Sequence, residues 1–145
     1  MAITTSAVCN SFKKELLEGT HNFNASGGNS FKLSLYTSSA TLGKSTTSFT
    51  TDNQVSNSGQ YVSGGGALTN GGTSVASSVA IVDFADRSFT GVTVTARGAI
   101  IYNDTATGDP AVAVLDFGAD KSATSGTFTI QFPAFTTSAA ILRIT

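Results

Sequence analysis

The sequence predicts a mainly β protein, an antiparallel β-sandwich or barrel with one short N-terminal helix, and three observations support this prediction. Several segments alternate apolar and polar residues with the period of two that strands show. Runs of Gly, Asn, Asp and Ser separate these segments, as turns do. A helical pattern occurs once, near the start. Because 145 residues with 40% hydrophobic content can bury one core, we expect a single β-rich domain over residues 1–145.

The first nine residues are predicted to form an extended N-terminal arm. Its stretch from Ile3 to Val8 is compatible with a strand, carries no charged side chain and contains no turn that would fold it back as a hairpin. Such a segment can add a strand to an exposed sheet edge on a neighbouring subunit. The alternative is that the arm packs against its own domain, as chain termini often do.

A short helix is predicted within residues 10–19, with Asn10 or Ser11 as N-cap and Gly19 as the residue that ends it. Its narrow apolar stripe consists of Phe12, Leu16 and Leu17. Lysines near its start and Glu18 at its end oppose the helix dipole, and two turns are too short to persist alone. We therefore expect the helix to dock on its own sheet or on another subunit. The candidate subunit-interface residues are Ile3, Val8, Phe12, Leu16 and Leu17.

Strands are predicted over most of the remaining chain. The segments with strand character are 31–36, 78–84, 92–102, 111–117, 127–132 and 140–144. Those at 78–84 and 111–117 are almost continuously apolar, which indicates interior strands, whereas the others alternate and should have one core face. The predicted core contains Leu33, Leu35, Val94, Ile100, Leu115, Phe117, Phe128 and Ile130.

Turns are predicted at 70–72, 107–110 and 125–126, where Gly, Asn, Asp and Pro gather. The polar stretch 37–66 has little periodicity and is expected to be a long excursion with short strands near Phe49 and Tyr61. Several closely spaced strands with little helix favour an antiparallel sandwich or barrel.

The composition excludes several classes of partner. Eight basic and nine acidic residues give a net charge of -1, and the basic residues are scattered, whereas phosphate binding needs them clustered. No apolar run approaches the roughly 20 residues of a membrane-spanning helix, and residues 1–9 do not resemble a secretion signal. We therefore expect no nucleic acid and no membrane as partners, and synthesis in the cytoplasm. A single cysteine, Cys9, rules out an internal disulfide.

Candidate catalytic and metal-binding residues are present but lack the patterns that such chemistry requires. No serine lies in a nucleophile elbow that could serve the single histidine, His21, and Cys9 has no neighbouring histidine. Five oxygen-bearing residues could surround a calcium ion: Asn103, Asp104, Asp109, Asp116 and Asp120. Their spacing fits no calcium loop, and a hairpin turn explains most of them. We therefore predict no catalytic residue, no cofactor and no metal.

Two glycine-containing motifs resemble functional sequences, the metal-binding tripeptide of kinases and a phosphate-binding loop, but lack the surrounding residues. Residues 116–118 spell Asp-Phe-Gly without the other kinase motifs. The run 64–66 is Gly-Gly-Gly but leads into Ala-Leu-Thr instead of Lys-Ser/Thr and a helix. Flexibility or a close backbone approach explains this run better.

Six motifs occur in a recognisable order along the chain. They are N-S-F-K-K-E-L-L-E-G-T-H-N-F at 10–23, F-K-L-S-L-Y-T at 31–37, G-G-G-A-L-T at 64–69, T-A-R-G-A-I-I-Y at 95–102, L-D-F-G at 115–118 and F-T-I-Q at 128–131. This succession resembles a family of small virion structural proteins of tailed bacteriophages, many from aquatic bacteria, over nearly the whole chain. Members often carry a tryptophan just before the T-A-R-G strand, where this chain has Phe89.

The resemblance implies a structural protein of the virion, made in the host bacterial cytoplasm. Its expected role is that of a capsid decoration or cement protein, which binds the outer surface of the phage head and fastens adjacent major capsid subunits. Homo-oligomerisation would reinforce the modest interface of each copy. One alternative is a tail, fibre or baseplate component. A second alternative is a glycan-binding module with exposed Tyr36, Tyr61 or Tyr102 as stacking platforms.

Overall fold

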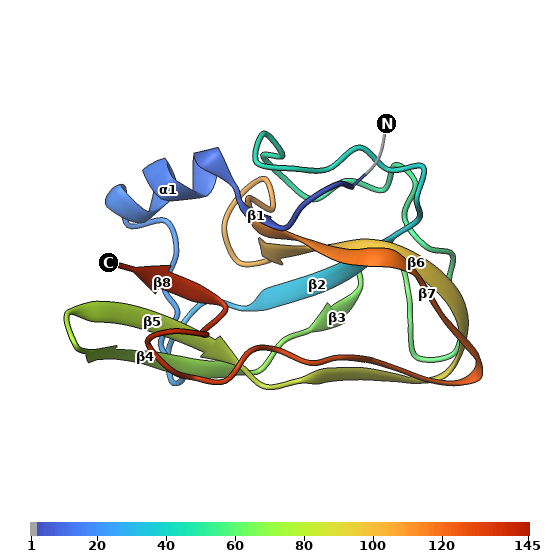
Figure 1. The fold of residues 1–145 in the computed structure, drawn as a ribbon. Coiled ribbons are helices and arrows are strands. Elements are labelled where there is room, and N and C mark those ends of the chain that lie inside the picture. The colour runs from blue at the N-terminus through green and yellow to red at the C-terminus, as the bar shows by residue number, and fades with distance from the viewer. Residues whose placement is uncertain (1–2) are drawn as a thin grey trace.

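In a computed structural model, which describes residues 3–145, the chain forms two antiparallel sheets and one short helix (Figure 1). The larger sheet has the strand order β1 (Ala7–Val8), β7 (Ala111–Ile130), β6 (Arg87–Asn103), β2 (Phe31–Tyr36) and β3 (Gly66–Ala67). The smaller sheet has the order β4 (Asn70–Ala76), β5 (Val79–Phe84) and β8 (Leu142–Ile144). The helix α1 spans Asn10–Leu17.

The predicted fold class is confirmed: the protein is mainly β, its sheets are antiparallel, and the helix is short and near the N-terminus. Of the two architectures left open, the sandwich-like one is correct, because neither sheet closes into a barrel. The larger sheet ends on β1 and β3, each only two residues long. β1 pairs only with Ala113 and Val114 of β7, so most of β7 remains a sheet edge, and bulges interrupt the regular pairing of its ladder with β6.

A long hairpin of β6 and β7 dominates the structure and corrects the predicted strand count. The segments 111–117 and 127–132 were expected to be separate strands, but residues 111–130 form one strand, which pairs with β6 in an irregular register. The predicted turn at 125–126 lies within this ladder, where Val92 pairs with Gly126 and the register shifts through β-bulges. The predicted turn at 107–110 is confirmed as the hairpin turn, with positive φ at Gly108 and Asp109.

Both faces of β2 are buried, although its alternation predicts one core face. The loop 37–66 packs over the second face and covers Ser34 and Tyr36. The Tyr36 hydroxyl donates to the Thr50 carbonyl oxygen at 2.6 Å and accepts from Ser34 Oγ at 3.0 Å. Polar side chains can therefore lie inside because they satisfy one another there. The expected short strands in this loop are isolated bridges, one of them between Ser58 and Tyr61.

The core lies between the two sheets and contains a continuous aromatic cluster. Phe23 and Phe31 stack with centroids 4.5 Å apart, and Phe84 of the smaller sheet meets Phe31 edge-on at 5.6 Å. Six of the eight predicted core residues are buried: Leu33, Leu35, Val94, Ile100, Phe128 and Ile130. Leu115 and Phe117 are half-buried at the margin of the same cluster. Phe89 is fully buried and packs edge-on against Tyr61 at 5.2 Å.

Replacing Phe128 with alanine should destabilise the protein more than the same change at Leu115. Phe128 is buried and packs against Phe117, so its removal leaves a cavity that should cost about 3–5 kcal/mol of unfolding free energy. Leu115 is half-exposed, so its truncation should cost less, about 2 kcal/mol. Urea titrations of both variants measure the difference, and equal midpoints would show that the strand faces are misassigned.

The smaller sheet confirms one predicted interior strand and corrects one turn. β5 lies between β4 and β8, as its apolar sequence predicted. Residues 70–72 were predicted as a turn, but they form the start of β4, where a bulge absorbs the glycines. The turn that joins β4 to β5 falls instead at Ser77 and Ser78, both with positive φ, as a two-residue hairpin requires. The last strand covers Leu142–Ile144, within the predicted 140–144.

Candidate functional site

An apolar groove with a volume of about 320 Å³ lies between α1 and the smaller sheet. Figure 1 shows α1 above β8 and β5, with the C-terminus beside them. The helix side of the groove is formed by Val8, Phe12, Lys13, Leu16 and Phe23. The sheet side is formed by Thr73, Ala80, Ile81, Val82, Leu142, Arg143 and Ile144. We refer to this feature as the α1 groove.

The sheet wall of the α1 groove is built by cross-strand pairing. Ala80 pairs with Val75 on one side and with Ile144 on the other, so these three side chains form an apolar row across the sheet. Val75 and Ile144 remain 73% and 59% exposed. The next row on the same face, Thr73, Val82 and Leu142, lies closer to the core. The face near the β4–β5 hairpin tip is thus apolar and uncovered.

The helix wall is held in place by contacts that replace a conventional N-cap. The N-cap is Cys9, not Asn10 or Ser11 as predicted, and it makes no side-chain capping bond. The Asn10 N–H donates to the Lys44 carbonyl oxygen at 2.8 Å, so the loop 37–66 satisfies part of the first turn. Gly19 ends the helix with a φ of 75°, as predicted.

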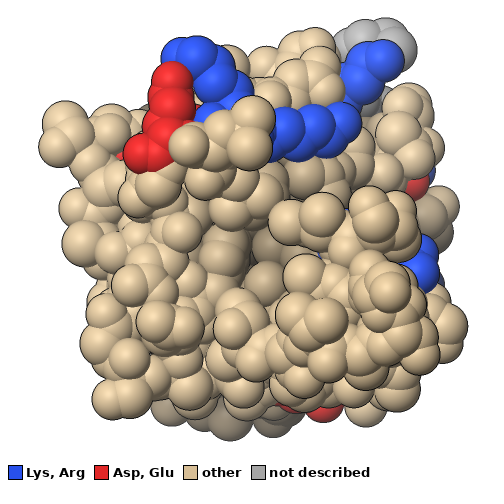
Figure 2. All heavy atoms as spheres, turned by 90° about the vertical axis from the view of Figure 1, so that its left-hand side faces the viewer, with Lys and Arg blue, Asp and Glu red and all other residues tan. Residues whose placement is uncertain are grey.

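The face around the α1 groove has few charged side chains. Figure 2 shows it hollowed near its centre, with most of the visible charged side chains along its upper edge and a few at its right and lower margins. Lys14 Nζ lies 2.9 Å from Glu18 Oε1 on the exposed side of the helix. Arg143 turns away from the apolar row, because its Nη1 donates to the Thr137 carbonyl oxygen at 3.0 Å. Two cations are among the described residues that line the groove, Lys13 and Arg143, and neither forms an ion pair with an acidic side chain.

The five candidate interface residues have different exposures. Ile3 and Phe12 lie inside the chain's own core, and β1 pairs Ala7 and Val8 with β7 of the same chain. Val8 and Leu16 are half-buried in the wall of the α1 groove. Leu17 is 92% exposed. The described part of the arm thus packs against its own domain. The candidate interface residues that remain accessible to a partner are Val8, Leu16 and Leu17.

The packing of the arm changes how an interface at this end can be tested. A truncation beginning at Thr20 would delete Ile3, Cys9 and Phe12, which are buried in the core. Such a deletion removes core volume and should unfold the domain. Surface substitutions on α1 are therefore the appropriate test.

His21 belongs to a buried polar network that joins the helix to the larger sheet. Its Nδ1 accepts from Asn103 Nδ2 at 3.1 Å, which places the proton on Nε2, and Nε2 donates to Glu15 Oε1 at 3.1 Å. Phe12 lies against the ring with centroids 4.9 Å apart. The imidazole is completely buried, and its two hydrogen bonds join Glu15 of the helix to Asn103 of β6.

The acidic loop does not gather around a cation site. Asp104 lies 3.2 Å from Lys32 Nζ, and Asn103 is buried, with its Oδ1 accepting from the backbone N–H groups of Thr105 and Ala106. Within residues 3–145, no cluster of three or more His, Cys, Asp or Glu side chains is placed to hold a metal ion.

The Asp-Phe-Gly tripeptide lies in β7 where the register between β6 and β7 shifts. Asp116 Oδ1 accepts from the Gly118 N–H at 2.9 Å and from Arg97 Nε at 3.1 Å, while its own N–H donates to Ser6 Oγ. The Gly118 N–H and then Arg97 lower the pKa of Asp116. Gly118 has a φ of 80°, which explains why glycine follows here. The motif thus ties β6, β7 and the N-terminal arm together.

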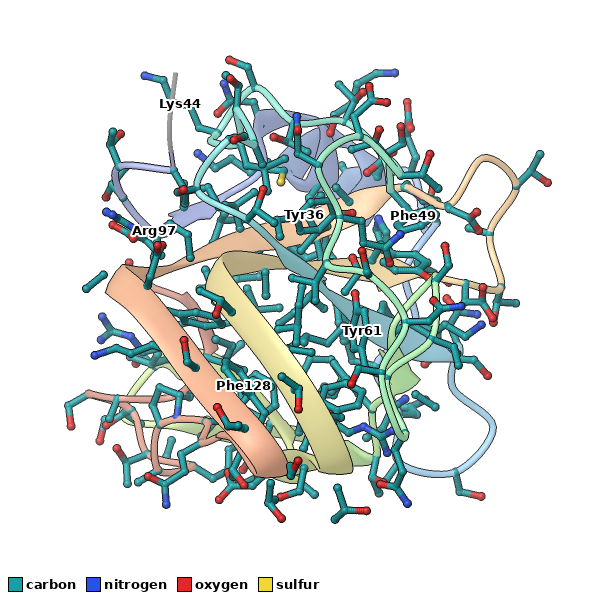
Figure 3. All side chains as sticks on the ribbon, turned by 90° about the vertical axis from the view of Figure 1, so that its right-hand side faces the viewer. Tyr36, Lys44, Phe49, Tyr61, Arg97 and Phe128 are labelled. Atoms are coloured by element: carbon teal, nitrogen blue, oxygen red, sulfur yellow. The ribbon has the colours of Figure 1, made fainter. Side chains whose placement is uncertain are left out.

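The three tyrosines considered as glycan platforms are buried, so this expectation was wrong. Figure 3 shows Tyr36 and Tyr61 in the interior of the molecule. The Tyr61 hydroxyl accepts from the Leu35 N–H at 2.7 Å, and the Tyr102 hydroxyl donates to the Gly64 carbonyl oxygen. Because backbone groups satisfy these hydroxyls, the rings can lie under the loop 37–66. Burial raises the pKa of all three phenols.

Cys9 is fully buried, as its interpretation as a small apolar residue predicted. Burial, and then the nearby Glu15 carboxylate, raise the pKa of the Cys9 thiol from 9.0 to about 11. The thiolate is the reactive form, so a buried thiol with a raised pKa should be inert at neutral pH.

The folded protein should lose stability as the pH rises from 9 to 11. The folded-state pKa of Cys9 lies above its ordinary value of 9.0, so its stabilising contribution is complete below pH 9.0 and is lost as the pH rises through about 11. The raised pKa values of the tyrosines have the same sign at higher pH. Urea titrations at intervals between pH 8 and 11 measure the slope, and Cys9→Ala should flatten its first part. An equally steep slope in that variant would contradict the assignment to Cys9.

No protein-family description, no curated protein and no solved structure matches this chain. Within residues 3–145, no helix has the length and apolar character needed to span a membrane. The resemblance to phage virion proteins therefore rests on the succession of sequence motifs.

Proposed function

We propose that this chain is a structural protein of a tailed-bacteriophage virion and acts as a capsid decoration or cement protein. In this role it binds the outer surface of the head, contacts the major capsid protein and stabilises the shell against internal pressure. It carries out no catalysis and needs no cofactor.

One observation carries the proposal: the sequence motifs that carry the resemblance contact one another in the folded chain. Arg97 of the T-A-R-G motif pairs with Asp116 of the L-D-F-G motif. Gly65 of the G-G-G-A-L-T motif lies against the backbone of Leu33 in the F-K-L-S-L-Y-T motif. The first motif meets the end of β6 through His21 and Asn103. These contacts support the proposal because the motifs that carry the resemblance are packed against one another in this fold.

The surface also suits a protein that is packed against others. Charged residues make up 12% of the sequence, against about 25% in typical soluble domains. The α1 groove and the exposed apolar row beside it form a patch of the kind that marks protein contacts. Large interfaces are depleted in charged residues at their centres, as this face is.

The copy number of the chain in purified virions tests the proposal. A decoration protein should be present in hundreds of copies, and added protein should saturate undecorated heads at that ratio and raise their melting temperature. Six copies, or a small multiple of six, would instead place the chain in the tail, fibre or baseplate. Absence from purified virions would contradict both roles.

A control separates specific binding to heads from adsorption. Val62→Asp changes an exposed apolar residue, 51% accessible, outside the α1 groove. Leu17→Asp changes an exposed residue beside the groove. Both variants should fold, and any difference in saturation between them shows whether heads are bound through the helix face.

A further inference from the structure

The face that contains the α1 groove carries both a protruding apolar side chain and a cavity of apolar lining. Leu17, at the end of α1, is 92% exposed, and no other large hydrophobic side chain in residues 3–145 is more exposed. Two residues of the same helix line the groove: Lys13, one turn before Leu17, and Leu16, which directly precedes it. Leu17 cannot fill the groove of its own chain, because Leu16 and Phe12 already line that side of the helix.

The opposite wall presents further uncovered apolar surface. Val75 and Ile144 flank Ala80 in one row of the smaller sheet. β8 pairs only with β5 among the described strands, so its other edge faces the groove region unpaired. A leucine side chain that entered the groove would bury its own surface and cover this row.

The charges on α1 favour a second copy of the same helix as the occupant. Lys13 lines the groove near the positive end of the helix dipole, and Glu18 follows Leu17 at the negative end. Both placements are unfavourable within one helix. Between two copies they become complementary, because the leucine of one chain would bring its neighbouring glutamate to the lysine of the other. The Lys14–Glu18 contact does not oppose this, since exposed i, i+4 pairs contribute little.

We propose that two copies of this chain associate through this face about a two-fold axis, each inserting Leu17 into the α1 groove of the other. A two-fold interface must be self-complementary, and this face supplies the protrusion, the cavity, the acid and the base from one surface. Glu18 of each copy pairs with Lys13 of its partner. The inference goes beyond the proposed function and does not depend on it, since the dimer forms in the purified protein.

Sedimentation equilibrium over a wide concentration range tests the dimer. The wild-type protein should show twice the 14.7 kDa chain mass at high concentration. Leu17→Asp should weaken association at least about a hundredfold, because two leucine side chains would lose their buried sites. Val62→Asp is the control, because it places the same charge at an exposed apolar residue outside the groove, and it should dimerise like the wild type.

A charge exchange distinguishes the proposed pairing from a general apolar contact. Lys13→Glu and Glu18→Lys should each weaken the dimer by roughly two- to thirtyfold, and the double variant should restore it. Lys13→Glu should also raise the melting temperature of the monomer, because it suits the helix dipole better. If Lys13 instead stabilised the monomer, Lys13→Glu would lower the melting temperature of the monomer.

Three results would overturn the proposal. They are a wild-type protein that stays monomeric up to millimolar concentration, a Leu17→Asp variant that dimerises as tightly as the wild type, and a stoichiometry other than two. A monomer that binds phage heads in a Leu17-dependent way would assign the same face to a capsid protein instead.

Discussion

Replacing Gly65 with alanine should prevent stable folding. Gly65 has a φ of 80°, and a Cβ at this position would overlap the carbonyl oxygen of Leu33. Leu33 lies in β2, which is paired on both sides by β3 and β6, so its backbone cannot move away. Backbone strain and steric overlap together should cost about 4 kcal/mol or more, a large part of the 5–15 kcal/mol that stabilises typical domains.

The control for this variant is Gly43→Ala. A Cβ on Gly43 would meet no atom within 4 Å, and its φ is not in the left-handed region. Its unfolding free energy should stay within about 0.5 kcal/mol of the wild type. Circular dichroism and thermal melts of both variants provide the comparison. A Gly65→Ala protein that melted like Gly43→Ala would show that the G-G-G segment is loosely held.

Replacing Asn103 with alanine should have the second largest effect, a loss of about 3–5 kcal/mol of unfolding free energy. The Asn103 side chain is buried and accepts from two backbone N–H groups in the β6–β7 turn, at 3.0 and 3.1 Å. It also donates to His21 Nδ1 at 3.1 Å and to Asn29 Oδ1 at 2.9 Å. Alanine would leave all four groups without this partner in a region that water reaches poorly.

A double-mutant cycle with His21→Ala tests the network directly. If the two side chains act through their shared hydrogen bond, the combined cost should fall short of the sum by roughly 0.5–3 kcal/mol. Asn57 is a suitable control, because its Oδ1 also caps a backbone N–H, that of Ser63, but on the exposed surface. Asn57→Ala should cost less than about 1 kcal/mol. Additive costs for Asn103 and His21 would argue against the network.

Local patterns in the sequence were sufficient to locate most strands but not to define their surroundings. The segment 31–36 was placed correctly because its alternation and turn boundaries are local properties. The burial of Ser34 was missed, because it depends on a loop that returns over β2. Residues 125–126 were misassigned as a turn, since a bulge within a long ladder has the same composition as a hairpin turn.

The candidate site could be predicted only on its helix side. The apolar stripe of α1 pointed to Leu16 and Leu17, whose spacing is visible in eight consecutive residues. The other wall brings together Val75, Ala80 and Ile144, which are adjacent only through the register of three strands. The N-cap was misplaced for the same reason, because the loop carbonyl of Lys44 that supports the first turn is remote in sequence.

The pairing of β1 with β7 has a consequence for synthesis in the cell. Ala7 pairs with Val114, so the start of the chain finds its place only after more than a hundred further residues have been made. At about 5–20 residues per second, the segment around Ile3 and Cys9 waits roughly 5–20 seconds with its apolar side chains uncovered. Contacts so distant along the chain also slow folding itself. Nascent chains of this protein should therefore be clients of ribosome-associated chaperones.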